Sequence, residues 1–313
     1  MDLLYTLGSG SQWSNNEIRF SIRSALKNLH GLRDIFIVGE KPSFLQYNTP
    51  INGHTIFHIP FPDVYGQKNA DGNIIEKIVH ASSIQALSDD FIFINDDNYF
   101  IKPITTQNVT PFHKGNMNHI NPNTYNTVWG KRLGRTRLAL SNQGITPLHF
   151  DHHAPFPMKK SAVAETYAQF PDYKTDIGLT VKSIYGSIHY ADAPVMDVEK
   201  RMFRETFSLS DIHKLTANSL YLAHNDAGLT SPMKYFLFSL FPDPRPFELD
   251  DVDDKIIDIA QWEKEGKPFD KGSKLFIKYY PNKRNMHKIV QNNNTYLIRK
   301  KIDYYLTKII LSL

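Results

Sequence analysis

The sequence contains no cysteine among its 313 residues. Disulfide bonds, zinc–thiolate centres and thiol nucleophiles are therefore excluded, and a bound metal must use oxygen or imidazole ligands. Such ligands favour a hard cation, which points to Mg²⁺ or Mn²⁺ if a metal is bound at all.

Long apolar runs are also absent. No stretch approaches the roughly 18 apolar residues that a membrane span requires. The first ten residues, MDLLYTLGSG, lack the basic and apolar regions of a signal peptide. We therefore expect a cytoplasmic protein that is at most peripheral to the inner face of the membrane. A chain of this length can form one compact unit with an appended subdomain.

Acidic side chains are scarce at the end of the chain. From Gly266 onward only Asp270 and Asp303 oppose a series of lysines and arginines, so the preceding body is net acidic although the formal net charge is +4. We predict a domain at 1–248 and a basic, partly helical extension at 249–313 that packs on it. A basic extension is either a solvated surface or a binding site for a membrane surface or DNA. Residues 296–313 can form an amphipathic helix that docks on the core, forms a dimer interface or lies in a membrane interface.

The first third of the chain alternates between strand and helix patterns. Residues 3–6 are apolar and β-prone, and they run into a Gly-Ser loop at 8–11 that can approach a ligand closely. Helical spacing of apolar residues follows, from a cap at Ser14 or Asn15 to Gly31. The apolar run at 34–38 predicts a second buried strand. Strand, helix and strand with short connections indicate a parallel α/β sheet.

Another helix, at 73–87, leads into a strand at 91–94 that ends at an acidic cluster, residues 95–98. In open α/β sheets, ligands bind beyond the carboxyl ends of the strands. We therefore expect the Gly-Ser loop and the acidic cluster on one rim of the sheet. Further helices are predicted at 161–170, 176–190 and 232–240, with proline-rich turns between them.

The acidic cluster contains Asp96 and Asp97. Two adjacent carboxylates at the end of a buried strand repel each other strongly unless a positive charge lies nearby. A divalent metal supplies that charge, and Mg-type ions are usually held by one or two carboxylates together with the phosphates of a ligand. The alternative is an ordinary turn, because Asp-Asp-Asn is also common turn chemistry.

Two histidine-containing segments follow. Residues 149–155 concentrate three histidines beside a proline turn, so that one can deprotonate an attacking hydroxyl and another can bind a metal. The alternative is a loop of hydrogen-bonded histidines without a catalytic role. His224, Asn225 and Asp226 come directly after an apolar run and can supply a second carboxylate to the metal or cap a helix.

Glu17 lies in the first turn of the first predicted helix, close to the expected rim. The helix dipole favours a carboxylate in this position whatever its function. Capping of the helix is therefore one explanation, and a catalytic role is the other.

Taken in order, these segments resemble the Stealth family, which comprises capsular polysaccharide phosphotransferases and related N-acetylglucosamine-1-phosphotransferases. MDLLYTLGSG is similar to the family's opening strand and loop. NEIRFSIRSALKNL and RDIFIVGEKPSFL, within residues 16–45, are similar to its second region, and FIFINDDNYF at 91–100 is similar to the acidic end of that region. HHAPFPMKKSAVAE from His152 is similar to the third region, and LYLAHNDAG through YFLFSLFPDPRPFE, ending at Glu248, to the fourth.

The resemblance implies a GT-A-like nucleotide-sugar-binding domain with a mostly parallel central sheet and a helical C-terminal region. It places Glu17, Asp97 and His153 on catalytic positions. It places Asp96 and Asp226 on contacts to the metal or to the donor diphosphate, and we predict that Asp96, Asp97 and Asp226 hold the metal. We assign donor binding to polar or small residues of the matched regions: Tyr5, Thr6, Gly8, Arg19, Arg23, Lys174 and Asn225.

Two departures from the family pattern matter. Residues 11–14 join the first and second regions almost directly, where the family has a spacer. The family also carries an arginine after its third region, where this chain offers Lys174. Because lysine lacks the bidentate fork of arginine, this departure weakens the inference that a sugar phosphate, and not the bare sugar, is transferred.

The function predicted is a metal-dependent transferase that moves a sugar or sugar phosphate from a nucleotide-sugar donor to a hydroxyl of a glycan or lipid-linked glycan. His153 would act as general base, and Glu17 would position the donor or share that role. Phosphosugar transfer releases a nucleoside monophosphate and glycosyl transfer releases a nucleoside diphosphate, and these residues serve either route. Two alternatives are a glycosyltransferase that modifies hydroxylated bases in DNA through the aromatic-rich basic extension, and a non-catalytic nucleotide-sugar-binding protein.

Overall fold

The computed structural model describes residues 1–195, 200–243 and 246–249. In this part of the chain the central sheet has five strands in the order β4-β3-β1-β5-β8. These strands are Asp2–Leu7 (β1), Ile35–Gly39 (β3), Ile56–Ile59 (β4), Asp90–Ile94 (β5) and Phe156–Lys159 (β8). All neighbours pair in parallel except β8, which is antiparallel to β5 at the edge. The prediction of an α/β fold with a mostly parallel central sheet is confirmed.

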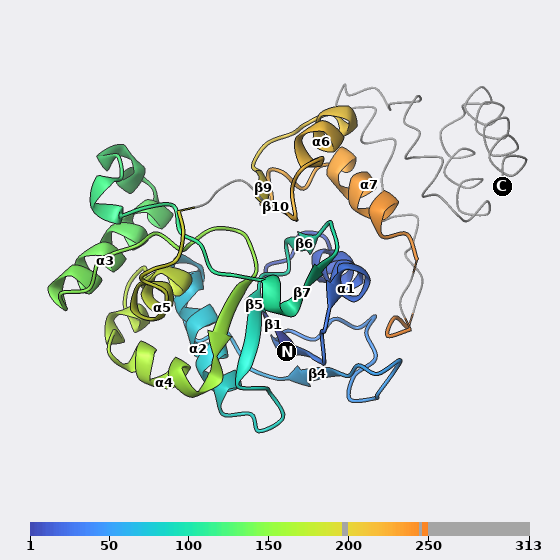
Figure 1. Cartoon of the computed structure of the whole chain (residues 1–313), viewed down its shortest axis with the longest axis horizontal. Helices are drawn as coiled ribbons and strands as arrows, with labels where there is room; N and C mark the ends of the chain where they lie inside the picture. The colour runs from blue at the N-terminus through green and yellow to red at the C-terminus, as the bar shows by residue number, and fades with distance from the viewer. Residues whose placement is uncertain (196–199, 244–245, 250–313) are drawn as a thin grey trace, which may run out of the picture.

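Helices cover both faces of this sheet. Figure 1 shows α2, α4 and α5 on one side of the central strands and α1 on the other. The helices of the described chain are Asn16–Asn28 (α1), Ala70–Ser82 (α2), Val128–Asn142 (α3), Lys160–Ala168 (α4), Val181–His189 (α5), Leu209–Thr216 (α6) and Ser231–Leu240 (α7). Short 3-10 turns occupy Gln67–Asn69, Thr106–Asn108, Met117–His119, Pro122–Asn126 and Pro171–Lys174.

Strand β5 shows why these residues form a doubly covered sheet. Phe91 and Phe93 pack into the apolar cluster on the α2 side, whereas Ile92 and Ile94 pack into the cluster on the α1 side. Successive side chains of a strand point to opposite faces, so a strand buried on both faces must be apolar at every position. The continuous apolar run that predicted this strand is therefore the signature of its place in the middle of the sheet.

A second, three-stranded sheet lies beside the first, with the order β6-β10-β9. It consists of Asn98–Phe100 (β6), Tyr221–His224 (β10) and Lys200–Phe203 (β9), and it shares an apolar cluster with α6 and α7. Strand β6 starts directly after the acidic cluster and pairs antiparallel with β10. This pairing brings residues 224–226 beside the carboxyl end of β5. A minor pair, Leu29–His30 (β2) and Ile104–Thr105 (β7), also forms.

Some element boundaries differ from the predictions. Helix α1 has Asn15 at its N-cap position, but Asn15 has a φ of 60° and its side chain makes no capping hydrogen bond. Instead, the Ser11 hydroxyl accepts the backbone N–H of Asn15 at 2.8 Å. Helix α5 begins at Val181 and not at Asp176, because Asp176 and Gly178 have positive φ values of 49° and 71°, which a helix does not permit. Helix α3 was not predicted.

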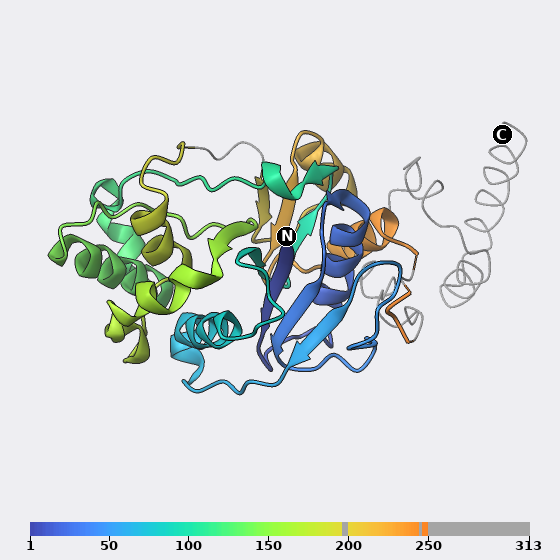
Figure 2. The same cartoon turned by 60° about the horizontal axis from the view of Figure 1, so that its bottom comes forward.

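The extension predicted at 249–313 lies outside the described residues except for Leu249, as does its predicted amphipathic helix at 296–313. Among the helices that are described, none combines the length and the apolar character needed to cross a membrane. Figure 2 shows that the central strands lie between α1 and α2 when the molecule is viewed from a second direction.

Candidate active site

Two adjoining cavities lie beyond the carboxyl ends of β1 and β5. The acidic cavity, of about 270 Å³, is lined by Thr6, Gly8, Ser11, Glu17, Asp96, Asp97, Asp226 and their neighbours. The arginine cavity, of about 370 Å³, is lined by Asp71, Trp129, Asp151, His153, Lys182, Arg204 and their neighbours. Ile74, Asn95 and Asn225 line both cavities, so the two are in direct contact. The Gly-Ser loop and the acidic cluster thus share one rim, as the strand order predicts.

Glu17 enters the acidic cavity from the first turn of α1. Its residue is 6% exposed, and the Ser11 hydroxyl donates a hydrogen bond to its Oε2 at 2.8 Å. Burial raises the pKa of Glu17, and the carboxylates of Asp97 and Asp226 raise it further. Glu17 is therefore held in place by the loop that precedes its helix, close to two other acidic groups.

The pKa values of Asp96 and Asp97 are shifted in opposite directions, although the two residues are neighbours in the chain. Burial raises the pKa of Asp96 to about 8, and repulsion from Asp97 and Glu17 adds to this effect. Burial also opposes ionisation of Asp97, but His153, His224 and the Asn98 amide hold the pKa of Asp97 below its usual value. The pair therefore prefers a single negative charge, on Asp97, unless a cation enters the cavity.

His153 lines the arginine cavity and faces Asp97, which lines the acidic cavity. Its Nδ1 lies 3.5 Å from Oδ2 of Asp97, and its side chain is 33% exposed. Because Nδ1 faces the carboxylate, Nε2 is the nitrogen that a substrate in the arginine cavity can reach. A base whose second ring nitrogen faces a carboxylate is the arrangement that orients histidines for proton transfer.

The neighbouring histidine has a different environment. His152 is 3% exposed, its Nε2 lies 2.8 Å from the Phe112 carbonyl oxygen, and its ring stacks on Phe112 at 4.0 Å. These contacts fit a packed, hydrogen-bonded histidine. His153, by contrast, has a side chain that is 33% exposed, and it lies beside the carboxylate of Asp97.

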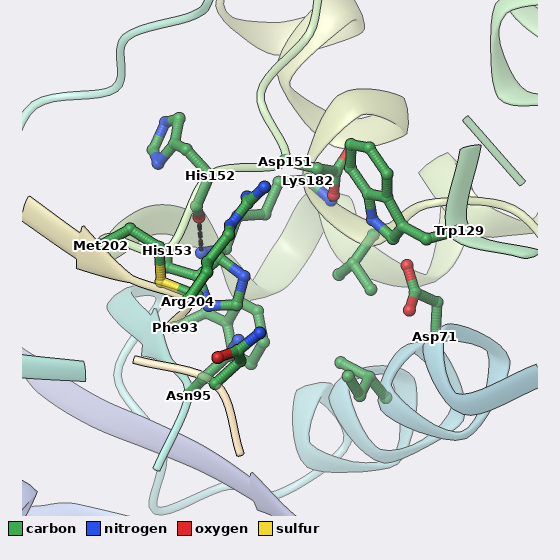
Figure 3. Close-up of a pocket in the computed structure, with 13 residues that line it drawn as sticks. Asp71, Phe93, Asn95, Trp129, Asp151, His152, His153, Lys182, Met202 and Arg204 are labelled. Carbon is green, nitrogen blue, oxygen red and sulfur yellow. Dashed lines mark hydrogen bonds between the residues drawn. The ribbon is translucent and has the colours of Figure 1, made fainter. Parts of the chain in front are cut away.

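The turn that carries His153 is fixed from α5. Lys182 donates from Nζ to the carbonyl oxygen of His152 at 2.9 Å (Figure 3). It also donates to the carbonyl oxygen of Ala154 at 2.7 Å, on the other side of His153. Asp151 accepts the backbone N–H groups of Lys182 at 2.9 Å and Ser183 at 3.1 Å. Burial lowers the pKa of Lys182 to about 8. The backbone around the histidine is thus tied to the start of one helix.

The segment after β10 completes the junction. The buried His224 lies with Nε2 2.8 Å from the Tyr99 hydroxyl, and burial lowers the pKa of His224. The Asn225 side chain accepts the N–H of Gly228 at 2.9 Å, and Asp226 is exposed at the wall of the acidic cavity. Residues 225 and 226 are therefore available to a ligand, whereas His224 supports the wall.

The predicted metal ligands do not form a complete centre on their own. Within the described ranges, no group of three or more His, Asp or Glu side chains is arranged to hold a metal ion. Mg²⁺ and Mn²⁺ nevertheless need only one or two carboxylates when phosphates and water supply the remaining ligands. The repulsion that raises the pKa of Asp96, and the buried Thr6 hydroxyl oxygen, which has no hydrogen-bond partner, fit a cation bound together with a phosphate ligand.

Four of the side chains assigned to donor binding lie elsewhere. Tyr5, Arg19, Arg23 and Lys174 are not among the described residues that line either cavity. Tyr5 is fully buried with its hydroxyl 2.9 Å from that of Ser21, because alternate residues of β1 face α1. Lys174 is 54% exposed and lies 3.7 Å from the carboxylate of Glu76.

Arg19 and Arg23 form a buried ion-pair network with Glu248 instead. Arg19 donates to Oε2 of Glu248 at 2.6 Å, and Arg23 donates from Nε to Oε1 at 2.6 Å. The three side chains are 4%, 0% and 3% exposed. Arg23 also donates to the carbonyl oxygens of Phe241 at 2.9 Å and Pro242 at 3.2 Å, and neither arginine lines the acidic cavity. In this structure both arginines anchor α1 through Glu248, and their assignment to donor binding stays a prediction that the described contacts do not support.

Sequence reasoning missed several residues of the arginine cavity, including Asp71, Lys182, Arg204 and Trp129. Arg204 follows β9, and Trp129 begins helix α3, an element that was not predicted. Trp129 is 38% exposed, which is unusual for the largest apolar side chain. Neither residue has a sequence motif around it, and only the folding of distant segments around His153 brings them together.

No protein-family model matches this sequence. The chain is 23% identical over 277 residues to an exopolysaccharide phosphotransferase of Streptomyces coelicolor, an alignment that covers 75% of this chain and 46% of that protein. It is 25% identical over 171 residues to an exopolysaccharide phosphotransferase of Nocardia farcinica, covering 50% of this chain and 32% of that protein. The chain spans less than half the length of these curated relatives. It is thus a distant homologue of proteins that are named exopolysaccharide phosphotransferases.

Proposed function

We propose that this chain is a Stealth-like phosphosugar transferase with a GT-A-like domain, which moves a sugar phosphate from a nucleotide-sugar donor to a hydroxyl of a glycan or lipid-linked glycan. The observation that carries this proposal is the position of His153. It lies where the two cavities meet, with Asp97 at 3.5 Å on one side and the arginine cavity on the other. A base in this position can reach an acceptor in one cavity while the donor occupies the other.

The names of the two relatives support the choice of phosphosugar transfer over transfer of a bare sugar. Both are called exopolysaccharide phosphotransferases, and both align with this chain although they are considerably longer. The order of the matched segments, from the MDLLYTLGSG strand to Glu248, supports the Stealth resemblance independently of overall identity. The activity of the full-length relatives is extended to this chain only as part of the proposal.

The donor diphosphate is assigned to the acidic cavity. Asp96, Asp97 and Asp226 would hold Mg²⁺ or Mn²⁺ there together with donor phosphate oxygens. When bound, such an ion neutralises the charge that develops on the departing phosphate. Thr6 and Gly8 lie at the wall where β1 ends, and the absence of a side chain at Gly8 lets the donor approach the backbone. Glu17, held by Ser11, would position the donor from the end of α1.

The transfer step requires a proton acceptor beside the incoming hydroxyl. Nε2 of His153 takes the proton while the acceptor oxygen forms a bond to the phosphorus that carries the sugar. The bond between that phosphorus and the nucleoside monophosphate oxygen breaks at the same time. Asp97 stabilises the imidazolium that results, because its pKa is lowered by the same histidine. Nucleoside monophosphate leaves, and the sugar phosphate becomes a diester on the acceptor.

The test is to incubate the chain with Mn²⁺, a panel of nucleotide sugars and candidate saccharide acceptors, and to identify the released nucleotide by mass. Release of nucleoside monophosphate that requires both acceptor and metal supports the proposal. Release of nucleoside diphosphate would identify a glycosyltransferase and overturn phosphosugar transfer. Binding of a nucleotide sugar without any release, over the whole panel, would favour the non-catalytic alternative. The DNA alternative depends on the basic extension, which lies outside the described residues apart from Leu249.

A further inference from the structure

The two cavities differ in the charges that they present. The acidic cavity is lined by Glu17, Asp96, Asp97 and Asp226, and its lysine, Lys77, already binds Asp63 and the Leu7 carbonyl oxygen. No cation of this cavity is left for those four carboxylates among the residues that the structure describes. The acidic cavity therefore suits a ligand that arrives with a metal ion.

The arginine cavity has the opposite arrangement. Its two carboxylates both have partners, since Asp71 accepts a hydrogen bond from Arg132 at 2.6 Å and Asp151 accepts those at the start of α5. Arg204 is exposed at the wall of the cavity, and its guanidinium makes no hydrogen bond or ion pair with any described residue. A planar guanidinium with unused donors beside a cavity matches the two oxygens of a phosphate.

Trp129 gives this cavity a second feature. Figure 3 shows Trp129 and Asp71 on one side of the cavity, with Arg204, His153 and Asn95 on the other. The indole is 38% exposed and is held 5.8 Å from the His149 ring. A rigid, half-exposed aromatic plane can cover the apolar face of a sugar ring while the sugar's hydroxyls remain free for polar contacts.

We propose that the arginine cavity binds a saccharide that already carries a phosphate, with Trp129 against the sugar ring and Arg204 on the phosphate. This deepens the proposed function, on which it rests, by naming the acceptor class: the hydroxyl presented to His153 belongs to a phosphorylated sugar and not to a neutral one. Arg204 is then a specificity-determining residue for the acceptor. A bidentate, charge-assisted hydrogen bond of this kind raises the affinity for the phosphorylated ligand by about 10- to 100-fold.

The proposal can be tested by binding, without turnover. Glucose 6-phosphate, mannose 6-phosphate, the two parent sugars and inorganic phosphate are titrated into the full chain, in EDTA and without a donor, with detection by ligand-observed NMR. At least one sugar phosphate is expected to bind about 10-fold or more tightly than its parent sugar. Arg204→Ala is expected to remove that preference, and Trp129→Ala to weaken sugar and sugar phosphate alike.

Arg135→Ala is the matched control. Arg135 is a partly exposed arginine that pairs with Asp176 and does not line the arginine cavity, so its loss is expected to leave the preference unchanged. Arg204→Lys keeps the positive charge but lacks the paired N–H donors of a guanidinium. It is therefore expected to keep only part of the preference for sugar phosphates over neutral sugars. Equal binding of phosphorylated and neutral sugars, or an unchanged preference in Arg204→Ala, would overturn the proposal.

A second arm separates the acceptor phosphate from the donor phosphate. Nucleotide-sugar affinity in Mn²⁺ is measured for wild type and Arg204→Ala. An unchanged donor affinity supports the acceptor assignment, whereas a loss of donor affinity with intact sugar-phosphate binding would assign Arg204 to the donor and overturn it. The binding titrations in EDTA use neither metal nor donor, so their result does not depend on whether any nucleotide is released. A protein that releases no nucleotide can therefore still show, or fail to show, the preference for sugar phosphates.

Discussion

The acidic cavity and the arginine cavity share three lining residues, yet their walls have opposite electrostatic character. In the acidic cavity, burial and, to a smaller extent, neighbouring carboxylates raise the pKa values of Asp96 and Glu17. In the arginine cavity each carboxylate has a hydrogen-bonding partner, and Arg204 has no hydrogen bond or ion pair with any residue that the structure describes. One cavity is thus stabilised by an arriving cation and the other by an arriving anion.

This difference bears on how one site could bind the two anionic substrates that we propose, each in its own cavity. A donor diphosphate is repelled by the acidic cavity unless a metal accompanies it, whereas a phosphate without metal is attracted to Arg204. His153 interacts with both cavities, because its Nδ1 faces Asp97 of the acidic cavity and its side chain lines the arginine cavity.

The largest effect is expected at the junction. His153→Ala should lower transfer turnover by about 10²- to 10⁴-fold, the usual contribution of a positioned general base, with little change in binding to either cavity. Turnover is measured by quantifying released nucleotide under saturating substrates. His152→Gln is the comparison variant: His152 is packed against Phe112, so its replacement should act mainly on stability. A His153→Ala protein with wild-type turnover would exclude His153 as the base.

The sequence predicts the parts of this arrangement that depend on local pattern. The apolar run of β5 ends at Asp96 and Asp97, and strand order then places them beside the Gly-Ser loop, as the structure shows. The matched segments also place Glu17, His153 and Asn225 around the same two cavities. These residues lie at strand or helix ends, where a periodic pattern stops and a polar segment begins.

The parts of the site that the sequence does not predict depend on contacts between distant segments of the chain. Arg19 and Arg23 were assigned to the donor from the same pattern, but their partner Glu248 lies more than 200 positions away in the chain. The spacing of residues along a helix determines which side chains share a face, but it does not determine which part of the protein packs against that face. Arg204 and Trp129 were missed for the same reason, since neither stands at the end of a strongly periodic segment. Lys174 was chosen by position, and the fold places it beside Glu76.

The anchor of α1 provides the second prediction. Glu248→Ala leaves Arg19 and Arg23 buried without their carboxylate, which should cost about 3–5 kcal/mol of unfolding free energy. Arg19 also donates to Asn16 at 2.9 Å, in the turn that carries Glu17. The acidic cavity should therefore lose donor affinity, while the preference of the arginine cavity for sugar phosphates persists.

Urea unfolding and the two binding assays measure these effects. Arg135→Ala serves as the control, because the exposed Arg135–Asp176 pair should contribute only about 0–1 kcal/mol. Equal losses of stability in Glu248→Ala and Arg135→Ala would refute the anchoring role. Equal losses of ligand binding in both cavities of Glu248→Ala would show that α1 supports the site as a whole.

The smallest effect concerns the stability of the metal-free protein. Burial and neighbouring carboxylates raise the pKa of Asp96 to about 8, so the folded chain binds a proton that the unfolded chain releases near pH 4. Between these two values the unfolded state binds fewer protons, and stability therefore falls as pH rises. Asp96→Asn removes this cost and should raise the melting temperature at pH 8, by about 2–4 °C for each kcal/mol that the buried charge costs.

Melting curves in EDTA from pH 4 to pH 8 test this for Asp96→Asn and wild type, with Arg204→Ala as the reference from the other cavity. Arg204→Ala should show the wild-type pH dependence, because it removes no carboxylate. When Mn²⁺ and a nucleotide sugar are added, the order should reverse: wild type is stabilised by ligand binding, and Asp96→Asn gains less because one metal ligand is gone. If Asp96→Asn were no more stable than wild type in EDTA at pH 8, ionisation of Asp96 would not destabilise the folded protein. The proposed electrostatic contrast between the two cavities would then be refuted.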